Sequence, residues 1–160
     1  MLFVIPDTHL GHENIKKYCN RPDNFESLIE KNWNEIIGKD DTVIHLGDIA
    51  MKSDIGDNFI KKLGSWNGRK ILIRGNHDKN PDEFYMQAGF TIVVTEMSMR
   101  FKDIKILFSH RPHLITTLIL TFMVISTISP FMMKQDCICR CRLNTWAISR
   151  WRLMITLSTD

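Results

Sequence analysis

Acidic, imidazole and amide side chains occur in short segments whose residue types could hold metal ions. The segments are Asp7-Thr8-His9, Gly47-Asp48, Gly75-Asn76-His77-Asp78 and Ser109-His110. Carboxylate, imidazole and amide donors together suit divalent manganese, iron or zinc better than calcium, which prefers oxygen ligands alone. Each ion needs several donors and one carboxylate can bridge two ions, so the set is large enough for a metal pair. Two ions about 3.5–4 Å apart clamp a phosphoryl group and generate a nucleophile from water near neutral pH, which is hydrolytic chemistry.

Each segment also has a simpler interpretation when it is taken alone. Asp-x-His can be a capped loop, Gly-Asp is a common turn pair, and Gly-Asn-His-Asp can be a turn with a hydrogen-bonded histidine. His45 and His113 are interpreted as structural residues. The ordered combination of the segments, rather than any one of them, favours a metal site.

The elements that must position these segments follow an alternating strand and helix pattern up to about residue 110. Short apolar runs predict strands, and apolar residues three or four apart predict helices. Strands are expected at 2–5, 42–46, 70–73, 91–94, 97–101 and 104–108, and helices at 25–37, around 59–63 and at 81–88. A tight Lys102-Asp103 turn is expected to join the last two strands. The pattern is typical of an α/β fold.

The candidate ligands come directly after predicted strands. In open α/β sheets ligands bind at the carboxyl ends of strands, so residues distant in sequence can meet at one edge. Asp7 and His9, two residues apart, can both reach one ion if the backbone between them is a turn rather than a regular strand. Gly47 and Gly75 would permit close backbone approach there.

The ordered segments resemble the calcineurin-like metallophosphoesterase family. Residues 7–15, Asp-Thr-His-Leu-Gly-His-Glu-Asn-Ile, are similar to small bacterial and phage members, and the likeness covers about two thirds of the chain. The resemblance implies a four-layer α/β/β/α sandwich, here incomplete at its C-terminal end. It also implies a two-metal phosphoesterase that hydrolyses a phosphomonoester or phosphodiester.

The same resemblance implies roles for individual residues. Asp7 and His9 would hold the first metal, Asp48 would bridge, and Asn76 and His110 would hold the second. His77 matches the catalytic histidine, with Asp78 as an orienting partner. Arg74 and His12 are near enough in sequence to contact substrate phosphate, although Arg74 is equally well interpreted as a solvated charge at a strand end.

The C-terminal part departs from the family pattern. The family ends with Gly-His-x-His, which gives each metal a further ligand, but no histidine follows His113 in this sequence. If the intended codons begin at the third base of each codon now translated, residues 122–128 permit His-Gly-His-Phe-His-Asn, with the glycine forced by Met123 and Val124. The sequence therefore predicts a phosphoesterase domain at 1–113 and a frame-shifted tail at 114–160.

The tail as translated has other interpretations. Residues 114–133 carry no charge and are long enough to span a bilayer, which would make a membrane-tethered protein, but Pro130 and the many Ser and Thr residues disfavour this. Cys137, Cys139 and Cys141 could bind a soft metal but lack the paired spacing of a structural zinc site. With two metal ligands missing, a catalytically inactive module that binds phosphate is the main alternative function.

Composition sets wider limits. A chain of 160 residues has the size of one domain. The net charge of +3 is too weak to indicate a nucleic-acid partner, although a nucleotide substrate stays open. The cysteine distribution and the absence of a signal-peptide pattern predict a reducing, cytoplasmic location and no membrane partner. The substrate and the oligomeric state cannot be predicted from the sequence.

Overall fold

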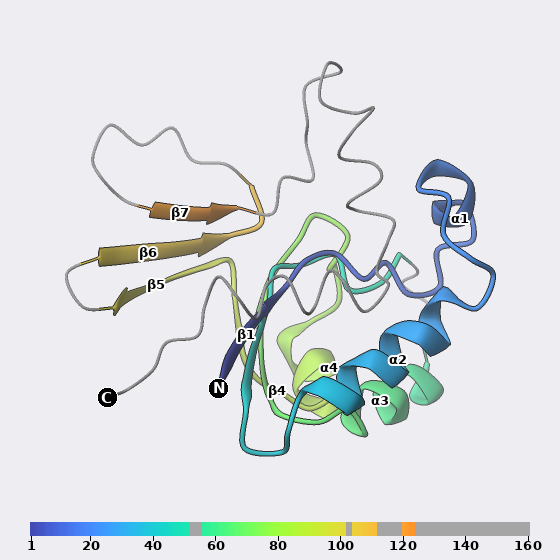
Figure 1. Ribbon diagram of the computed structural model, residues 1–160, viewed down its shortest axis with the longest axis horizontal. Coiled ribbons are helices and arrows are strands. Elements are labelled where there is room, and N and C mark those ends of the chain that lie inside the picture. The colour runs from blue at the N-terminus through green and yellow to red at the C-terminus, as the bar shows by residue number, and fades with distance from the viewer. Residues whose placement is uncertain (52–55, 102–103, 112–119, 124–160) are drawn as a thin grey trace.

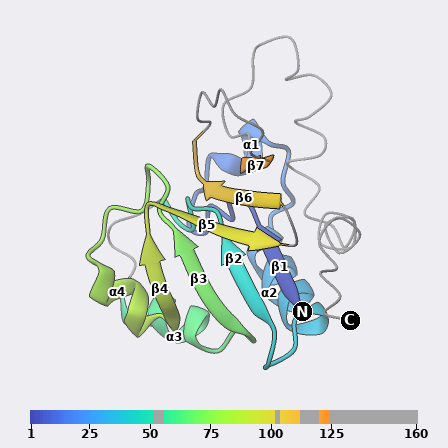
Figure 2. The same cartoon turned by 90° about the vertical axis from the view of Figure 1, so that its left-hand side faces the viewer.

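The computed structural model describes residues 1–51, 56–101, 104–111 and 120–123. The first half of the chain forms a parallel sheet in the order β1-β2-β3-β4. Its strands are β1 (Leu2–Ile5), β2 (Thr42–His45), β3 (Arg69–Ile73) and β4 (Phe90–Val94). Each pair of neighbours is parallel, with Ile5 opposite His45 and His45 opposite Leu72. The carboxyl ends of these strands therefore lie along one edge of the sheet (Figure 2).

Helices connect the successive strands. They are α1 (Ile15–Tyr18), α2 (Phe25–Ile36), α3 (Asp57–Gly64) and α4 (Asp82–Gln87). Since each parallel strand is added on the same side of the last one and such crossovers are right-handed, the connecting helices must cover the same face. Figure 1 shows α2, α3 and α4 together on that face.

A second sheet has the order β5-β6-β7, from β5 (Glu96–Phe101), β6 (Ile104–Ser109) and β7 (Leu120–Met123). β5 and β6 are antiparallel, whereas β6 and β7 are parallel. This sheet crosses the face of the first sheet that the helices leave free (Figures 1 and 2).

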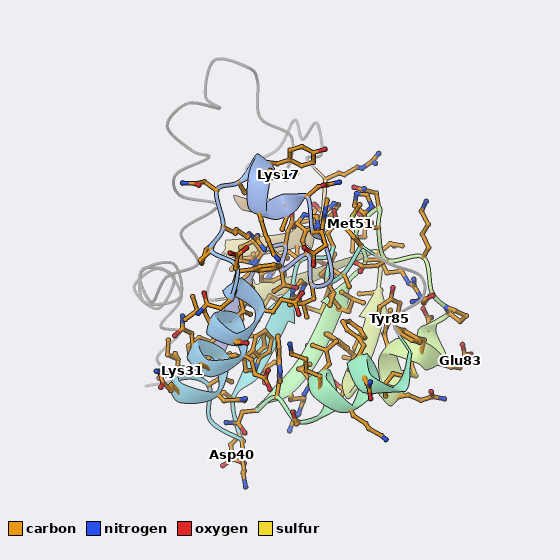
Figure 3. All side chains as sticks on the ribbon, turned by 90° about the vertical axis from the view of Figure 1, so that its right-hand side faces the viewer. Lys17, Lys31, Asp40, Met51, Glu83 and Tyr85 are labelled. Atoms are coloured by element: carbon orange, nitrogen blue, oxygen red, sulfur yellow. The ribbon has the colours of Figure 1, made fainter. Side chains whose placement is uncertain are left out.

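Two hydrophobic clusters hold these layers together. The larger one packs the helices on the first sheet, and at its centre Trp33 of α2 lies 4.9 Å from Trp66, ring to ring. Figure 3 shows Tyr85 of α4 turned toward the sheet, whereas Lys31 and Glu83 extend outward. The smaller cluster joins the two sheets through Ile73 of β3 and Phe108 of β6, both fully buried.

The described residues thus form the helix, sheet and sheet layers of an α/β/β arrangement, which confirms the predicted fold class. The fourth layer of the expected sandwich, the Lys102-Asp103 turn and His113 lie outside the described residues. The predicted strands and helices up to residue 109 are present with ends shifted by one or two residues. Two elements, α1 and β7, are not predicted by the periodicity. Among the helices of the described residues, none has the length and apolar character needed to cross a membrane.

Candidate metal centre

The loops that follow β1 and β2 are joined to each other beyond the ends of their strands. The His9 N–H donates to the Asp48 carbonyl at 3.0 Å, and the Leu10 N–H donates to the Ile49 carbonyl at 2.7 Å. His9 and Asp48 have φ angles of 50° and 51°, in the left-handed region that non-glycine residues rarely adopt. The chain therefore turns at His9, as a shared ion for Asp7 and His9 requires.

Asp7, His9 and Asp48 form a compact group at this edge of the sheet. One ligand atom from each residue lies within 4.8 Å of the others. Two buried polar atoms of the group, Asp7 Oδ1 and His9 Nδ1, have no hydrogen-bond partner among the described residues. Leaving buried polar atoms unpaired costs free energy, which a cation at this position would remove. The donor set and the unpaired oxygen fit a divalent metal.

Asn76 and His110 complete a second set of donors around the same Asp48. His110 Nδ1 lies 2.8 Å from the Leu46 carbonyl, which can only accept, so Nδ1 carries the hydrogen. In the neutral ring Nε2 then presents a lone pair, and it faces Asn76 Oδ1 at 3.1 Å and Asp48 Oδ2 at 3.6 Å. Converging lone pairs of this kind fit a second cation. His110 Nδ1 is also 3.9 Å from Asp7 Oδ1, so the two sets are contiguous.

Gly47 and Gly75 let these loops touch. A Cβ at Gly47, whose φ is +99°, would lie 2.5 Å from the Gly75 nitrogen and 2.8 Å from His110 Nδ1. A Cβ at Gly75 would lie 2.4 Å from the Asp48 nitrogen and 2.2 Å from Asp48 Oδ1. All of these distances are far below ordinary contact, so the predicted close backbone approach is confirmed at Gly47 and at Gly75.

Asp78 binds backbone amides of the ligand loops. Its Oδ2 accepts from the N–H groups of Asp48 at 2.7 Å and Gly75 at 2.8 Å, and its Oδ1 accepts from Ile49 at 3.1 Å. Burial raises the pKa of this carboxyl, while the three N–H groups act in the opposite direction. Both oxygens of Asp78 are thus directed to backbone N–H groups, and its role as an orienting partner of His77 stays a prediction.

His77 and His12 lie beside the group of ligands. His77 Nε2 is 3.9 Å from Asp48 Oδ2, and its ring centroid is 6.0 Å from that of His9. The His12 ring centroid lies 5.8 Å from that of His9. Burial lowers the pKa of His12 below its ordinary value, and the neighbouring imidazoles of His9 and His77 lower it further. The catalytic role of His77 and the contact of His12 with phosphate stay predictions.

The guanidinium of Arg74, for which contact with substrate phosphate is predicted, has several partners within the protein. It donates to the carbonyls of Asp78 at 2.7 Å and Asn80 at 2.8 Å, forms an ion pair with Asp82, and lies 5.0 Å from the centre of the Tyr85 ring. These contacts brace the loop between β3 and α4. The predicted contact of Arg74 with phosphate stays a prediction, and it would require the guanidinium to leave these partners.

Arg21 and His45 hold the backbone of the first two loops of the site, a role that the sequence does not predict. The buried Arg21 donates to the carbonyls of Thr8 and Asp7, which fixes the backbone of the first ligand loop. His45 Nδ1 accepts from the Gly47 N–H at 3.2 Å, so its Nε2 carries the hydrogen toward Thr8 Oγ1, also 3.2 Å away. Burial lowers the pKa of His45 to about 3. His45 is thus a neutral structural residue, as expected.

The fold and these segments define a calcineurin-like phosphoesterase. The model of that family matches residues 2–116, and the chain belongs to it. The family is one of metal-dependent enzymes that act on phosphate esters. The match confirms the family that the ordered segments resemble.

Individual proteins are similar to this chain over part of their length. "Uncharacterized protein MJ1445" of Methanocaldococcus jannaschii is 40% identical over 87 residues, 52% of this chain and 49% of that protein. "Gene 66 protein" of Mycobacterium phage L5 is 43% identical over 100 residues, 58% of this chain and 48% of that protein. The chain thus matches about half the length of these curated relatives. The crystal structure of AQ665 from Aquifex aeolicus, a protein of unknown function, matches with a TM-score of 0.62 and 28% identity, covering 89% of this chain and 70% of that one.

Proposed function

We propose that residues 1–113 form a two-metal phosphoesterase domain that hydrolyses a phosphomonoester or a phosphodiester. The observation that carries the proposal is the buried Asp7 Oδ1, which lacks a hydrogen-bond partner among the described residues and lies beside His9 and Asp48. Asp7 and His9 would hold the first ion, and Asn76 and His110 the second. Asp48 would contact both, since its carboxylate lies between the two sets of donors.

Bound divalent ions would polarise the phosphoryl group and supply a nucleophile from water. The protein's own part in the reaction falls to His77, whose side chain is 35% exposed beside Asp48. A protonated imidazole at this position would donate its proton to the departing alkoxide oxygen. His12, next to His9, would contact the phosphate oxygens. Manganese is the ion that we would supply first.

We also propose that residues 114–160 are an out-of-frame tail. The match to the family model ends at residue 116, close to the point where the sequence changes character. β7 pairs in parallel with β6, with Met123 opposite Ser109, so both strands end at the same side. The His-Gly-His-Phe-His permitted by the shifted codons of residues 122–128 would follow β7 there, at the strand end that carries His110. Residues 120–123 lie in this strand, which disfavours a membrane helix at 114–133.

The main alternative is a phosphate-binding module without turnover, because two metal ligands of the family pattern are missing. Loss of ligands weakens metal binding and can abolish activity. The cytoplasmic location predicted from cysteine usage belongs to both proposals. They differ in whether bound phosphate esters are cleaved.

Hydrolysis of p-nitrophenyl phosphate and bis(p-nitrophenyl) phosphate with and without added manganese tests the proposal. The chain as translated should be compared with one whose tail is restored to the shifted frame. We expect manganese-dependent hydrolysis that is abolished by Asp48→Asn in both and is at least tenfold faster in the restored chain, since it regains a donor at each ion. Binding of inorganic phosphate without cleavage by either chain would favour the binding module. Equal rates for the two chains would contradict the frame-shift proposal.

A further inference from the structure

Asp78 makes an unusual set of contacts for a carboxylate that is 5% exposed. No salt bridge offsets its charge among the described residues. Instead it accepts the three backbone hydrogen bonds from Asp48, Ile49 and Gly75 described above. Hydrogen bonds to an ionised acceptor are about twice as strong as neutral ones, so three of them can retain a buried charge. The groups that they hold belong to the loops after β2 and β3.

The link between the two loops is reciprocal. The Asp78 side chain holds the backbone of Asp48, and the Asp48 side chain in turn accepts the His77 N–H through Oδ1 at 2.9 Å. One carboxylate oxygen of Asp48 is thereby fixed, and the other, Oδ2, is left facing His110 and His77. The direction of the carboxylate that lies between both donor sets therefore depends on the pairing that Asp78 maintains.

The backbone at Asp48 also needs this support. A non-glycine residue at a φ of 51° is strained by about 1–3 kcal/mol and persists only where its surroundings impose the conformation. The Asp48 N–H is held by Asp78, and the next N–H, of Ile49, is held by the other oxygen of the same carboxylate. Two successive amides anchored to one group define the turn.

We infer that Asp78 is a positioning residue that aims Asp48 at the metal ions by clamping the loops after β2 and β3 together. It would act through the backbone N–H groups that its two oxygens accept, and it is not one of the proposed ligands. The inference rests on the proposed metal site. It predicts that loss of Asp78 weakens metal binding beyond what a general loss of stability would do.

Manganese titration of the full chain, monitored by electron paramagnetic resonance, tests the inference with Asp78→Asn and a matched control. The asparagine keeps the size of Asp78. Its NH₂ group, however, would face a backbone N–H that in the unchanged protein donates to the Asp78 carboxylate. The control is Asp41→Asn, at the opposite end of β2, where the Asp41 carboxylate also accepts a backbone N–H, from Gly38 at 2.7 Å, and pairs with the amino terminus. Both variants lose a structural carboxylate, but only one adjoins the ligand loops.

We expect Asp78→Asn to raise the dissociation constant of manganese about 10–100-fold, the range for groups that orient metal ligands, and Asp41→Asn to leave it within about twofold. Equal affinity in Asp78→Asn and Asp41→Asn would overturn the inference while leaving the metal site intact. Absence of manganese binding in the unchanged chain would instead overturn the proposed function. If Asp78→Asn does not fold, Asp78→Glu decides, because it keeps the charge but displaces the oxygens. Its inability to fold, or an unchanged affinity, would make Asp78 a residue of the fold alone and contradict the inference.

Discussion

The contact between Gly75 and Asp48 predicts a large effect from a single methyl group. In Gly75→Ala the new Cβ would lie 2.4 Å from the Asp48 nitrogen, whereas real Cβ contacts essentially never fall below 3.0 Å. The loops would have to separate by at least about 0.6 Å, the difference between these two distances. The atoms in the way belong to the backbone of Asp48 and its hydrogen-bonded carboxylate, which cannot rotate aside. The substitution must therefore move the ligand loop.

Gly75→Ala should lower both the free energy of unfolding and the affinity for manganese. Overpacking a closely packed site costs about 1–3 kcal/mol, and alanine recovers about 0.4–1 kcal/mol by restricting the unfolded chain. We expect a net loss of about 1–2 kcal/mol in the free energy of unfolding without metal. Because the hydrogen bonds from Gly75 and Asp48 to Asp78 also lengthen, manganese affinity should fall at least about tenfold.

Urea unfolding in EDTA and manganese titration would measure the two effects. Gly64→Ala is the matched control, because a Cβ at the end of α3 meets no atom within 4 Å and should leave both quantities unchanged or raise stability slightly. If Gly75→Ala matched the unchanged protein in unfolding midpoint and in manganese affinity, the two loops could not be as close as the structure places them.

Further predictions concern acid stability, the core and the bridging ligand. The pKa of His45 is about 3 in the folded protein against 6.5 in the unfolded chain, so its contribution to stability is complete above about pH 6.5 and is lost as the pH falls toward 3, by up to ~1.4 kcal/mol per pH unit. His45→Asn should therefore flatten the dependence of the free energy of unfolding on pH, measured by urea unfolding in EDTA at pH 7, 6 and 5. An unchanged slope would contradict a neutral buried ring. Trp33→Ala should lower the free energy of unfolding by about 3–5 kcal/mol, since it removes the contact with Trp66 and the hydrogen bond from Nε1 to the Asn67 carbonyl. Tyr18→Ala, on the surface, should lower it by under about 0.5 kcal/mol in the same assay. Asp48→Asn should lower the metal content, measured by mass spectrometry after dialysis, more than His12→Ala does, and equal content would contradict a bridging Asp48.

The strands were predictable because burial on both faces leaves a direct trace in the sequence. β2 contains the apolar pair Val43-Ile44 and β3 the apolar run Ile71-Leu72-Ile73, as expected for parallel strands covered by helices on one face and a sheet on the other. The four residues of α1 are little more than one helical turn, too short for a helical period to show. β7 lies in a segment without charge or alternation, so nothing in its sequence separates it from its surroundings.

The candidate ligands could be placed from the sequence, whereas the residues that support them could not. Asp7, Asp48 and Asn76 follow parallel strands of one sheet, whose carboxyl ends meet at one edge, so topology alone brings these three together. His110 follows β6 of the second sheet, and it reaches them because that sheet packs on the first. The partners of Asp78 are backbone amides, which every residue carries and no sequence pattern marks. The direction of Arg74 likewise depends on carbonyls at Asp78 and Asn80, so its bracing contacts become visible only in three dimensions.

This difference bears on what the altered tail changes. The contacts that shape the site, from Arg21 and His45 on the first loops to Asp78 on the third, all lie upstream of residue 111. The proposed tail enters the described structure only through β7, which pairs with β6 next to His110. On that proposal, the missing Gly-His-x-His removes donors but leaves the contacts of Arg21, His45 and Asp78 in place. Metal affinity and turnover should then respond separately to changes in the two regions. Substitutions at Gly75 or Asp78 disturb the geometry of the donors, whereas restoring the tail raises their number.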